Sequence, residues 1–332
     1  MSKTKICKYD KLPSQRYLDI LEKNNMVISL DTEEWDVYFP LTDKADSKEL
    51  EGLGKVENKY IGVVTGTDCM INRRTVWMNL VNSYGREQAS RIMPETYILD
   101  DKKDIRRLKT DTRNHFILKD NRHRRLGLVL VDSVQKVLNE KEKSDIAQPL
   151  ITNLRRHKGT SFNFRVYALL TLHKNKLTAY LYYEGVCIYG KPPGKDIQMY
   201  DRMITHARNA IPEEFPELMS ELLDELEVEY KTFFRDLCEK INKLLDSAVH
   251  EFGKLENLEQ AKCFQVFGID ILVDTNNQAI ICEVNKGPSM KSKNENHGGI
   301  KNDMLEEMLS VMGLRTAENK GFIEISSWKI IT

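Results

Sequence analysis

Two runs near the C-terminus constrain the fold most, because they predict a β-hairpin whose polar face carries two carboxylates. Residues 267–274 and 280–285 are rich in β-branched and apolar side chains, and the polar segment 275–278 separates them. If the middle two residues of that segment form a two-residue turn, counting back along both strands places Asp270 directly opposite Glu283. The same alternation leaves the other face wholly apolar, formed by Ile269, Ile271, Val273, Ile280, Cys282 and Val284.

The opposed carboxylates of Asp270 and Glu283 predict a metal site. Such a pair lies about 4.5–5.5 Å apart at Cβ, and its repulsion destabilises a hairpin unless a cation intervenes. Asn285 lies two residues beyond Glu283 on the same face, so an amide oxygen joins the two carboxylates. Mg²⁺ prefers oxygen ligands of this kind and commonly bridges nucleotide phosphates. The alternative is an ordinary amphipathic hairpin whose acidic face is solvated.

The composition is that of an ordinary soluble globular protein. The 332 residues include 50 Lys plus Arg and 50 Asp plus Glu, and this zero net charge gives no reason to expect a nucleic-acid or membrane partner. Six scattered cysteines without a C-x-x-C pair fit a reducing compartment and argue against a zinc site. The sequence has neither an N-terminal apolar leader nor a run of about 20 apolar residues, so a cytoplasmic location is expected.

Hydrophobic periodicity along the rest of the chain indicates a mixture of helices and strands. Helices are predicted at 72–84, 212–252 and 302–312, and strands at 116–119, 126–131, 162–173, 177–185 and 321–331. No long linker, repeat or low-complexity segment interrupts these elements, so the lobes are expected to pack continuously.

Several blocks between residues 60 and 313 have the order and spacing of a known family. They are INRRTVWMNL (71–80), MPETYIL (93–99), FILK (116–119), FNFRVYALL (162–170), AYLYYEG (179–185), FQVFGIDILVD (264–274) and ICEVNKGPSM (281–290). Together they resemble the tubulin–tyrosine ligase-like family of ATP-grasp ligases, whose signature has the form G-x-D-x-x-x-D followed by E-V-N-x-x-P-S. By this resemblance the chain is identified as a member of the family.

The resemblance implies an α+β ATP-grasp fold, with a nucleotide between two α+β lobes and a smaller N-terminal lobe beside them. The N-terminal lobe would correspond to residues 1–100 and the central lobe to residues 101–150. Residues 151–332 would form the C-terminal lobe with the metal site, and the three lobes would make one continuous ligase domain.

The activity implied by the resemblance is an ATP- and Mg²⁺-dependent ligation that passes through an acyl phosphate. An amino acid, with glutamate expected from its frequency in the family, would be joined to an acidic protein tail like that of tubulin. A cytoplasmic location associated with the cytoskeleton would follow. Two alternatives remain: a catalytically weak or inactive module that binds nucleotide or tubulin, and a ligase that acts on another protein or peptide.

The resemblance also assigns roles to individual residues. Lys119 would contact the α/β-phosphates of ATP, and Arg165 would stabilise the acyl phosphate through its forked guanidinium. Asp270, Glu283 and Asn285 would hold Mg²⁺, and Asp270 would also face the nucleotide. Further nucleotide contacts are expected from Arg74, Arg124, Gly127, Gln148 and Thr205, with Arg73 facing the same cleft. The alternatives are a solvated basic loop at 122–128 and a solvated helix start at 73–74.

Four positions depart from the family pattern. Ser161 and Asn163 stand where the family has Lys and Asp, Ile188 replaces an Arg, and His206 replaces an Asn. These positions handle the nucleotide and the incoming amino acid in the family, so the identity of the donor stays open. They support the non-enzymatic alternative, whereas the presence of all the metal and phosphate residues favours the enzyme.

Overall fold

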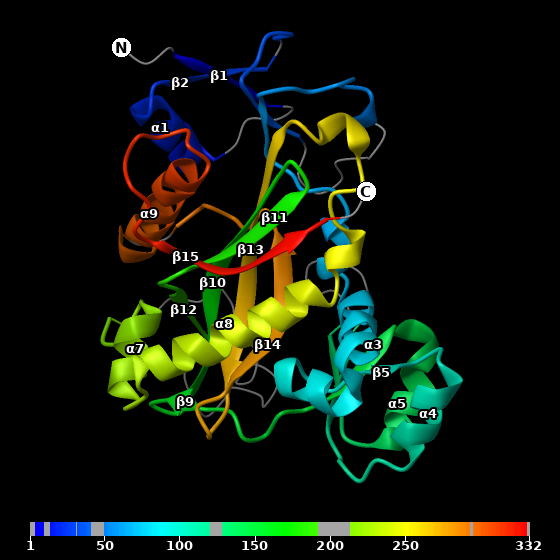
Figure 1. Cartoon of the computed structure of the whole chain (residues 1–332). Coiled ribbons are helices and arrows are strands. Elements are labelled where there is room, and N and C mark those ends of the chain that lie inside the picture. Colours follow the sequence, from blue (N-terminus) through cyan, green and yellow to red (C-terminus); the bar gives the residue numbers. More distant parts are fainter. Residues whose placement is uncertain are drawn as a thin grey trace.

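A long antiparallel strand pair, β10 (Thr160–His173) and β13 (Lys262–Val273), runs through the middle of the molecule (Figure 1). The computed structural model describes residues 4–9, 14–30, 32–40, 50–119, 128–191, 213–292 and 295–330. Most side chains of the two strands are buried, as is typical of strands covered on both faces. The pair forms the centre of an 11-stranded sheet.

The other strands extend this large sheet in both directions. They are β1 (Lys5–Tyr9), β2 (Met26–Ser29), β3 (Val37–Phe39), β4 (Tyr60–Ile61), β9 (Arg156–His157), β11 (Lys176–Tyr182), β12 (Val186–Tyr189), β14 (Ala279–Lys286) and β15 (Phe322–Lys329). The order is β15-β11-β10-β13-β4-β3-β1-β2, while β9 and β12 pair with β10 and β14 pairs with β13. The N-terminal strands β1 to β4 pair in parallel, and the pairs around β10 are antiparallel.

Helices cover both faces of the large sheet. They are α1 (Gln15–Lys23), α3 (Arg73–Ile92), α7 (Met219–Glu225), α8 (Tyr230–Asp246) and α9 (Glu295–Val311). Phe164 and Val166 of β10 share an apolar core with α3, α7 and α8, whereas Tyr167 and Leu169 share another core with α1 and α9. The alternation of side chains along one strand therefore separates two cores, and Figure 1 shows α8 crossing the sheet while α1 and α9 lie beside its N-terminal part.

The expected helix over 212–252 is wrong as a single helix. Residue 212 lies outside the described residues, and the chain that follows forms α7 and α8 with a break between them. Glu227 takes a left-handed conformation with φ 56°, which no helix continues through, and the Glu229 side chain then caps α8 by accepting the N–H groups of Lys231 and Thr232. Local backbone conformation thus interrupts an apolar stripe that looks continuous in sequence.

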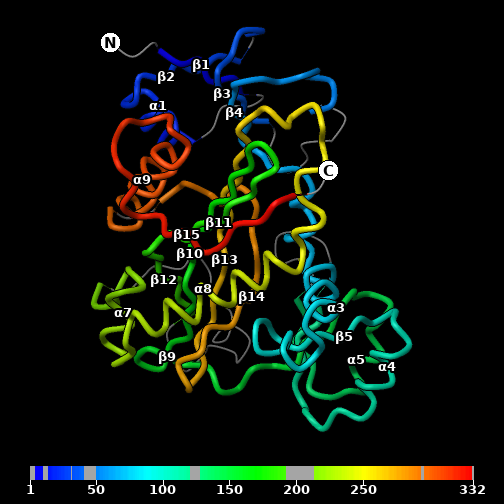
Figure 2. The backbone as a smooth tube through the Cα atoms, viewed as in Figure 1, coloured from blue at the N-terminus to red at the C-terminus, as the bar shows by residue number. Residues whose placement is uncertain are grey.

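A four-stranded sheet lies to one side of the large sheet, at the lower right of Figure 2. Its strands are β5 (Tyr97–Ile98), β6 (Phe116–Lys119), β7 (Val129–Val131) and β8 (Ile146–Pro149), in the order β5-β8-β6-β7, with helices α4 (Lys102–Lys109) and α5 (Val134–Glu140). Leu108, Phe116, Leu118 and Val137 belong to a separate apolar core. The small sheet therefore has an interior of its own. The fold is mixed α and β, and no helix of the described residues is both long and apolar enough to span a membrane.

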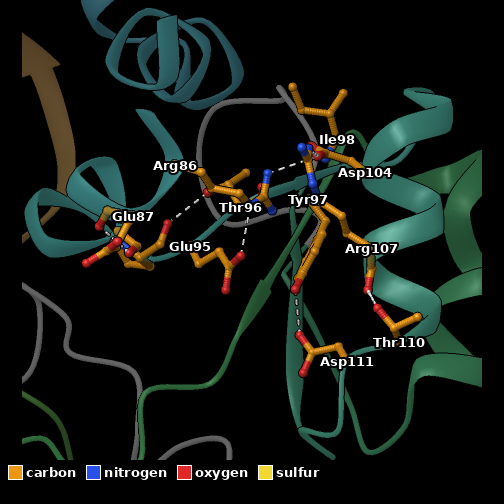
Figure 3. Close-up of polar contacts among 12 residues, drawn as sticks. Arg86, Glu87, Glu95, Thr96, Tyr97, Ile98, Asp104, Arg107, Thr110 and Asp111 are labelled. Carbon is orange, nitrogen blue, oxygen red and sulfur yellow. Dashed lines mark hydrogen bonds and ion pairs between the residues drawn. The ribbon is translucent and has the colours of Figure 1, made fainter. Parts of the chain in front are cut away.

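A network of ion pairs ties α3 to the small sheet (Figure 3). The Arg86 guanidinium lies 2.8 Å from Glu95 and 2.9 Å from Asp104, and it also donates to the Thr96 carbonyl at 2.9 Å. Arg113 binds the other Glu95 oxygen at 2.6 Å, so one carboxylate joins two arginines. Gly85, with φ 77°, breaks α3 just before Arg86. Because these groups are partly or fully buried and bonded in several directions, the network holds the part of α3 after that break against the small sheet.

We expect Asp111→Asn to lower the free energy of unfolding at neutral pH, and we expect this loss to shrink as the pH falls. Burial alone would raise the pKa of Asp111, but hydrogen bonds from Arg113 and Tyr97 outweigh it and lower that pKa from 3.8 to about 2. A carboxyl whose pKa falls on folding stabilises the fold above its unfolded pKa, and the contribution disappears as the pH falls through the folded pKa. The difference between the two proteins in unfolding free energy should be about 1–2 kcal/mol near neutral pH.

Urea unfolding at a series of pH values measures this difference. It should narrow steadily as the pH falls from about 4 toward about 2, because the wild-type carboxyl is then protonated in both states. A difference that stays constant over that range would contradict the assignment.

Candidate functional site

The turn of the β13–β14 hairpin differs from the two-residue turn expected from sequence. Asp274 pairs with Gln278, so the loop has three residues, and Asn277 takes a left-handed conformation with φ 63°. The Asp274 side chain accepts the N–H groups of Asn276 and Gln278 at 2.9 and 2.8 Å. This Asx-type bonding stabilises the three-residue loop and shifts the register near the turn by one residue.

A β-bulge then restores the expected register at the site. Ile271 pairs with Ile281, but Asp270 pairs with Glu283, which leaves Cys282 as the extra residue of β14. The prediction that Asp270 faces Glu283 is therefore confirmed, and Gly268 faces Asn285 as the same register requires. The expected apolar face is wrong near the turn: Ala279 and Ile281 are buried there in place of Ile280 and Cys282.

Arg165 lies against Asp270. The two residues are directly opposed on β10 and β13, and the guanidinium donates to both carboxylate oxygens, Nε to Oδ1 at 2.5 Å and Nη2 to Oδ2 at 2.9 Å. Burial disfavours the charged guanidinium, but the Asp270 carboxylate outweighs this effect and raises the pKa of Arg165. Arg165 therefore stays charged, in a fixed orientation, in the interior of the sheet.

Glu283 has a separate partner at the start of α3. Asn72 caps this helix by accepting the N–H of Thr75 at 3.1 Å, and Arg73 in its first turn reaches Glu283 at 2.7 Å. The Nε atom of Arg73 is buried and has no hydrogen-bond partner among the described residues. Arg74, for which a nucleotide contact is expected from sequence, instead pairs with Asp100 at 2.7 Å, and no described contact joins it to Glu283.

Lys119 approaches the same hairpin from the small sheet. It ends β6, it is 8% exposed, and among the described residues no carboxylate lies within ion-pair distance of it. Burial lowers its pKa; the next contributions come from Cys282, Arg73 and Glu283, so one thiol and two charged side chains affect the pKa of Lys119. The start of α3, the small sheet and the large sheet therefore bring three basic residues, Arg73, Lys119 and Arg165 respectively, toward the carboxylates of Asp270 and Glu283.

Gln148 lies on β8, next to the strand that carries Lys119. It is 2% exposed, and its amide donates to the Thr96 hydroxyl at 2.8 Å. Thr96 in turn donates to the Pro94 carbonyl at 2.9 Å, which fixes the direction of the hydroxyl. Sequence reasoning named Gln148 but gave Thr96 no role, although its block (93–99) was recognised.

The donor atoms at the hairpin fit a magnesium ion. Two carboxylates and one amide, all on neighbouring positions of β13 and β14, offer hard oxygen ligands. The described residues contain no cluster of three or more His, Cys, Asp or Glu side chains, so zinc-like ligation has no support there. A cation at this site would take its remaining ligands from substrate oxygens and water, as Mg²⁺ commonly does.

Three of the four departures from the family pattern, Ser161, Asn163 and Ile188, lie together on β10 and β12. Asn163 pairs directly with Ile188, and Ser161 lies two residues earlier on the same side of β10. The Oδ1 atom of Asn163 is buried and accepts no hydrogen bond from the part of the chain that the structure describes. Arg124, Gly127, Thr205 and His206 lie outside the described residues, so their expected roles stay predictions.

We expect Gly268→Ala to disturb Arg165. A Cβ at position 268 would lie 2.9 Å from Cδ of Arg165 and 2.8 Å from Cβ of Pro288, closer than such atoms pack. Overpacking of this kind costs about 1–3 kcal/mol, measurable by urea unfolding. Gly299→Ala in α9 is the control, because nothing lies within 4 Å of a Cβ there and alanine favours a helix. Equal stability of Gly268→Ala and the wild type would contradict the proposed packing.

Residues 64–320 match the sequence profile of the tubulin-tyrosine ligase family, and the chain belongs to this family. It is 25% identical over 166 residues to a probable alpha-tubulin polyglutamylase of Tetrahymena thermophila, which covers 46% of this chain and 40% of that protein. It is 27% identical over 186 residues to a probable tubulin–tyrosine ligase of Schizosaccharomyces pombe, with coverage of 52% and 41%.

A tubulin polyglutamylase of Caenorhabditis elegans is 24% identical over 261 residues, with 72% of this chain and 43% of that protein covered. The chain thus spans less than half the length of these relatives. The residues 64–320 that match the family profile include the paired carboxylates and the arginines described above.

Proposed function

We propose that this chain is an ATP- and Mg²⁺-dependent ligase that joins an amino acid to a carboxylate of a protein. The observation that carries the proposal is the charge pattern at the hairpin. Among the described residues, three basic side chains from three different elements, Arg73, Lys119 and Arg165, face the two carboxylates of Asp270 and Glu283. Three cations around two anions leave the site short of negative charge, and a nucleotide triphosphate supplies that charge.

In this proposal the nucleotide binds between the two sheets, in the manner of an ATP-grasp enzyme. Lys119 on the small sheet would hold the phosphates as a point charge, and Gln148 on the neighbouring strand would contact the adenine. Arg74, Arg124, Gly127, Thr205 and Asp270 would add further nucleotide contacts. Residues 1–100, 101–150 and 151–332 would be the N-terminal, central and C-terminal lobes of one ligase domain.

The proposed reaction has two steps. A carboxylate oxygen of the acceptor attacks the γ-phosphorus and displaces ADP, which leaves an acyl phosphate. The amine nitrogen of the amino acid then attacks the acyl carbon, phosphate leaves with the bonding pair of the C–O bond, and the nitrogen loses a proton to water. Arg165 would stabilise the charge that develops on the acyl phosphate, because its position is fixed before the reaction begins.

Asp270, Glu283 and Asn285 would hold the magnesium ion. When bound, this ion neutralises charge on the transferred phosphoryl group. Arg73 and Arg165 already orient the two carboxylates, through ion pairs of 2.7 and 2.5 Å, so these ligands need little rearrangement.

We infer that glutamate is the donor and that an acidic, tubulin-like tail is the acceptor. Support comes from the names of the relatives, two of which are tubulin polyglutamylases or probable ones. Such an acceptor would place the protein in the cytoplasm at the cytoskeleton. Neither a nucleic acid nor a membrane is needed as a partner, in agreement with the zero net charge.

Intact-mass measurement tests the proposal. The protein is incubated with ATP, Mg²⁺ and one amino acid at a time, together with a synthetic acidic peptide that resembles a tubulin tail. The expected result is an added mass of one or more glutamate residues that requires both ATP and Mg²⁺. If no amino acid is transferred to any acidic peptide, the ligase proposal fails.

The specific observation that favours a non-enzymatic module is the Asn163–Ile188 pair, where the family has charged side chains. Under that alternative the protein binds nucleotide or an acidic tail without transferring anything. ATP binding without transfer in the same assay would support it. Transfer to peptides of unrelated sequence, by contrast, would indicate a ligase with a different acceptor.

A further inference from the structure

Lys301 of α9 is a buried cation for which sequence reasoning gave no role. It begins a stripe that continues with Met304, Leu305 and Met308, at the three-, four- and seven-residue steps of a helix face. Those three methionine and leucine side chains are fully buried, and Lys301 is 8% exposed. The sequence alone could have pointed to Lys301, because a lysine within an apolar helix stripe is expected to be buried. Lysine is almost never buried without a partner.

The contacts of Lys301 leave its charge without an anion. Its Nζ donates to the Lys291 carbonyl at 2.6 Å, and among the described residues no carboxylate lies within ion-pair distance. An ammonium has three N–H donors, so two of them remain for another acceptor. Burying an ammonium that has no paired anion costs free energy. We therefore expect a bound anion to offset this cost.

The charged neighbours of Lys301 are themselves positive. Burial lowers its pKa from 10.5 to about 8, and Arg165 and then Arg16 contribute in the same direction. Lys301 therefore remains largely protonated at neutral pH. Arg16 is held by the Gly298 carbonyl and by Asn302, both at 2.7 Å, and it brings no carboxylate with it.

His297 adds no charge to this region at neutral pH. Burial is the main cause that lowers its pKa, to about 4, so the ring is neutral. Met304, Leu305 and Met308 share a core with Tyr167 and Leu169 of β10. Arg165 lies on that same face of β10, because side chains alternate along a strand. The stripe of α9 therefore turns Lys301 toward the sheet face that carries Arg165, a residue that we place at the reacting group of the proposed ligase.

We propose that Lys301 binds the α-carboxylate of the free amino-acid substrate, on the sheet face that carries Arg165. This inference rests on the proposed ligase function and names a part of its amino-acid site. In an amide-forming step the attacking nitrogen must reach the acyl carbon, and an α-carboxylate lies only two bonds from that nitrogen. A cation next to Arg165 is therefore where the carboxylate of the amino acid needs a counter-charge.

The other cations near the hairpin are less suited to this task. Lys286 already pairs with Asp68 at 2.8 Å, Arg73 pairs with Glu283, and Lys119 lies on the side of the small sheet. A purely structural role for Lys301 is the competing explanation, because its bond to the Lys291 carbonyl holds the segment that follows β14. The two explanations predict different kinetics.

Lys301→Met tests the proposal, with Lys240→Met as a matched control. Lys240 is also a buried lysine that donates to a carbonyl, that of Ala279 at 2.7 Å, but it has a carboxylate partner in Asp236 at 3.0 Å. The KM for L-glutamate should rise about 10- to 100-fold in Lys301→Met, while the KM for ATP should change less than about twofold. Lys240→Met should leave both constants nearly unchanged even if it lowers the melting temperature.

A substrate analogue gives an independent check. 4-Aminobutyrate lacks the α-carboxylate of glutamate, so it should be a poor substrate or ligand. Its KM or affinity should be the same for the wild type and for Lys301→Met. Lys301→Arg keeps the charge and should recover part of the glutamate affinity. If both KM values change together in Lys301→Met, or only the melting temperature changes, Lys301 is structural and the inference is overturned.

Calorimetric titration of L-glutamate into protein that holds Mg²⁺ and a non-hydrolysable ATP analogue separates this inference from the proposed function. Binding that is lost in Lys301→Met, in a wild type that transfers no amino acid, would support the inference while the ligase proposal fails. Transfer with an unchanged glutamate KM in Lys301→Met would leave the ligase and reject the inference. A wild type that binds none of the twenty amino acids would reject it as well.

Discussion

Replacing Glu283 with glutamine is expected to reduce turnover by about 10²–10³-fold while the protein remains folded. The substitution turns one charged ligand of the candidate magnesium site into a neutral amide of nearly the same shape. It also removes the anion that pairs with Arg73 at 2.7 Å, but that pair is partly exposed, so its effect on stability should be small. The loss should therefore appear in catalysis and in metal dependence, and only weakly in unfolding.

The measurements are the turnover number, the Mg²⁺ concentration that gives half-maximal activity, and the melting temperature. Glu87→Gln is the matched control, because Glu87 is 80% exposed and pairs only with Arg91 one helical turn away. The control should behave like the wild type in all three. Full activity in a folded Glu283→Gln protein would exclude the role that we propose for the carboxylate.

Replacing Arg165 with lysine is expected to lower turnover by about 10- to 100-fold and to change the KM for ATP much less. Lysine keeps the positive charge but cannot make the two bonds that hold the guanidinium against Asp270, at 2.5 and 2.9 Å. If Arg165 stabilises the acyl phosphate, its loss acts mainly after the phosphoryl group has moved. Some loss of stability is also expected, because Asp270 is left with a weaker buried partner.

Arg107→Lys serves as the control for this experiment. The side chain of Arg107 is more than half exposed, and its one contact with the described residues is with Asp104, at 3.0 Å. It should lose neither activity nor appreciable stability. A folded Arg165→Lys protein with full turnover would show that catalysis does not need the two-bond contact of the Arg165 guanidinium. If the wild type has no turnover at all, Arg165→Lys should alter only stability or ligand affinity, as expected for a binding module.

The sequence alone identified the family and the hairpin that carries the site. The block around Glu283 and the block around Asp270 are local patterns, and strict alternation of side chains on a strand placed both carboxylates on one face. Even so, the correct pairing of these two residues depended on two deviations that cancel. The loop has three residues with Asn277 in a left-handed conformation, and the bulge at Cys282 shifts the register back.

Which charges meet the carboxylates was decided by tertiary structure. Arg73 and Arg74 are adjacent in sequence, yet the start of α3 turns Arg73 toward Glu283 and Arg74 toward Asp100. Neighbouring residues on a helix point about 100° apart, and the sequence does not say which of them faces the sheet. The same holds for the break at Glu227, where one left-handed residue divides an apolar stripe into α7 and α8.

The sequence by itself thus determined the family, the mixture of helices and strands and the pair of carboxylates, because each of these is written in short-range patterns. Only the tertiary structure placed Arg165 on Asp270, 105 residues away in the chain, and turned the stripe of α9 that carries Lys301 toward the same face of the sheet. Ion pairs and buried charges depend on contacts between distant segments, and their energies depend on burial. No local pattern specifies either of these, so the environment of the site had to come from the fold.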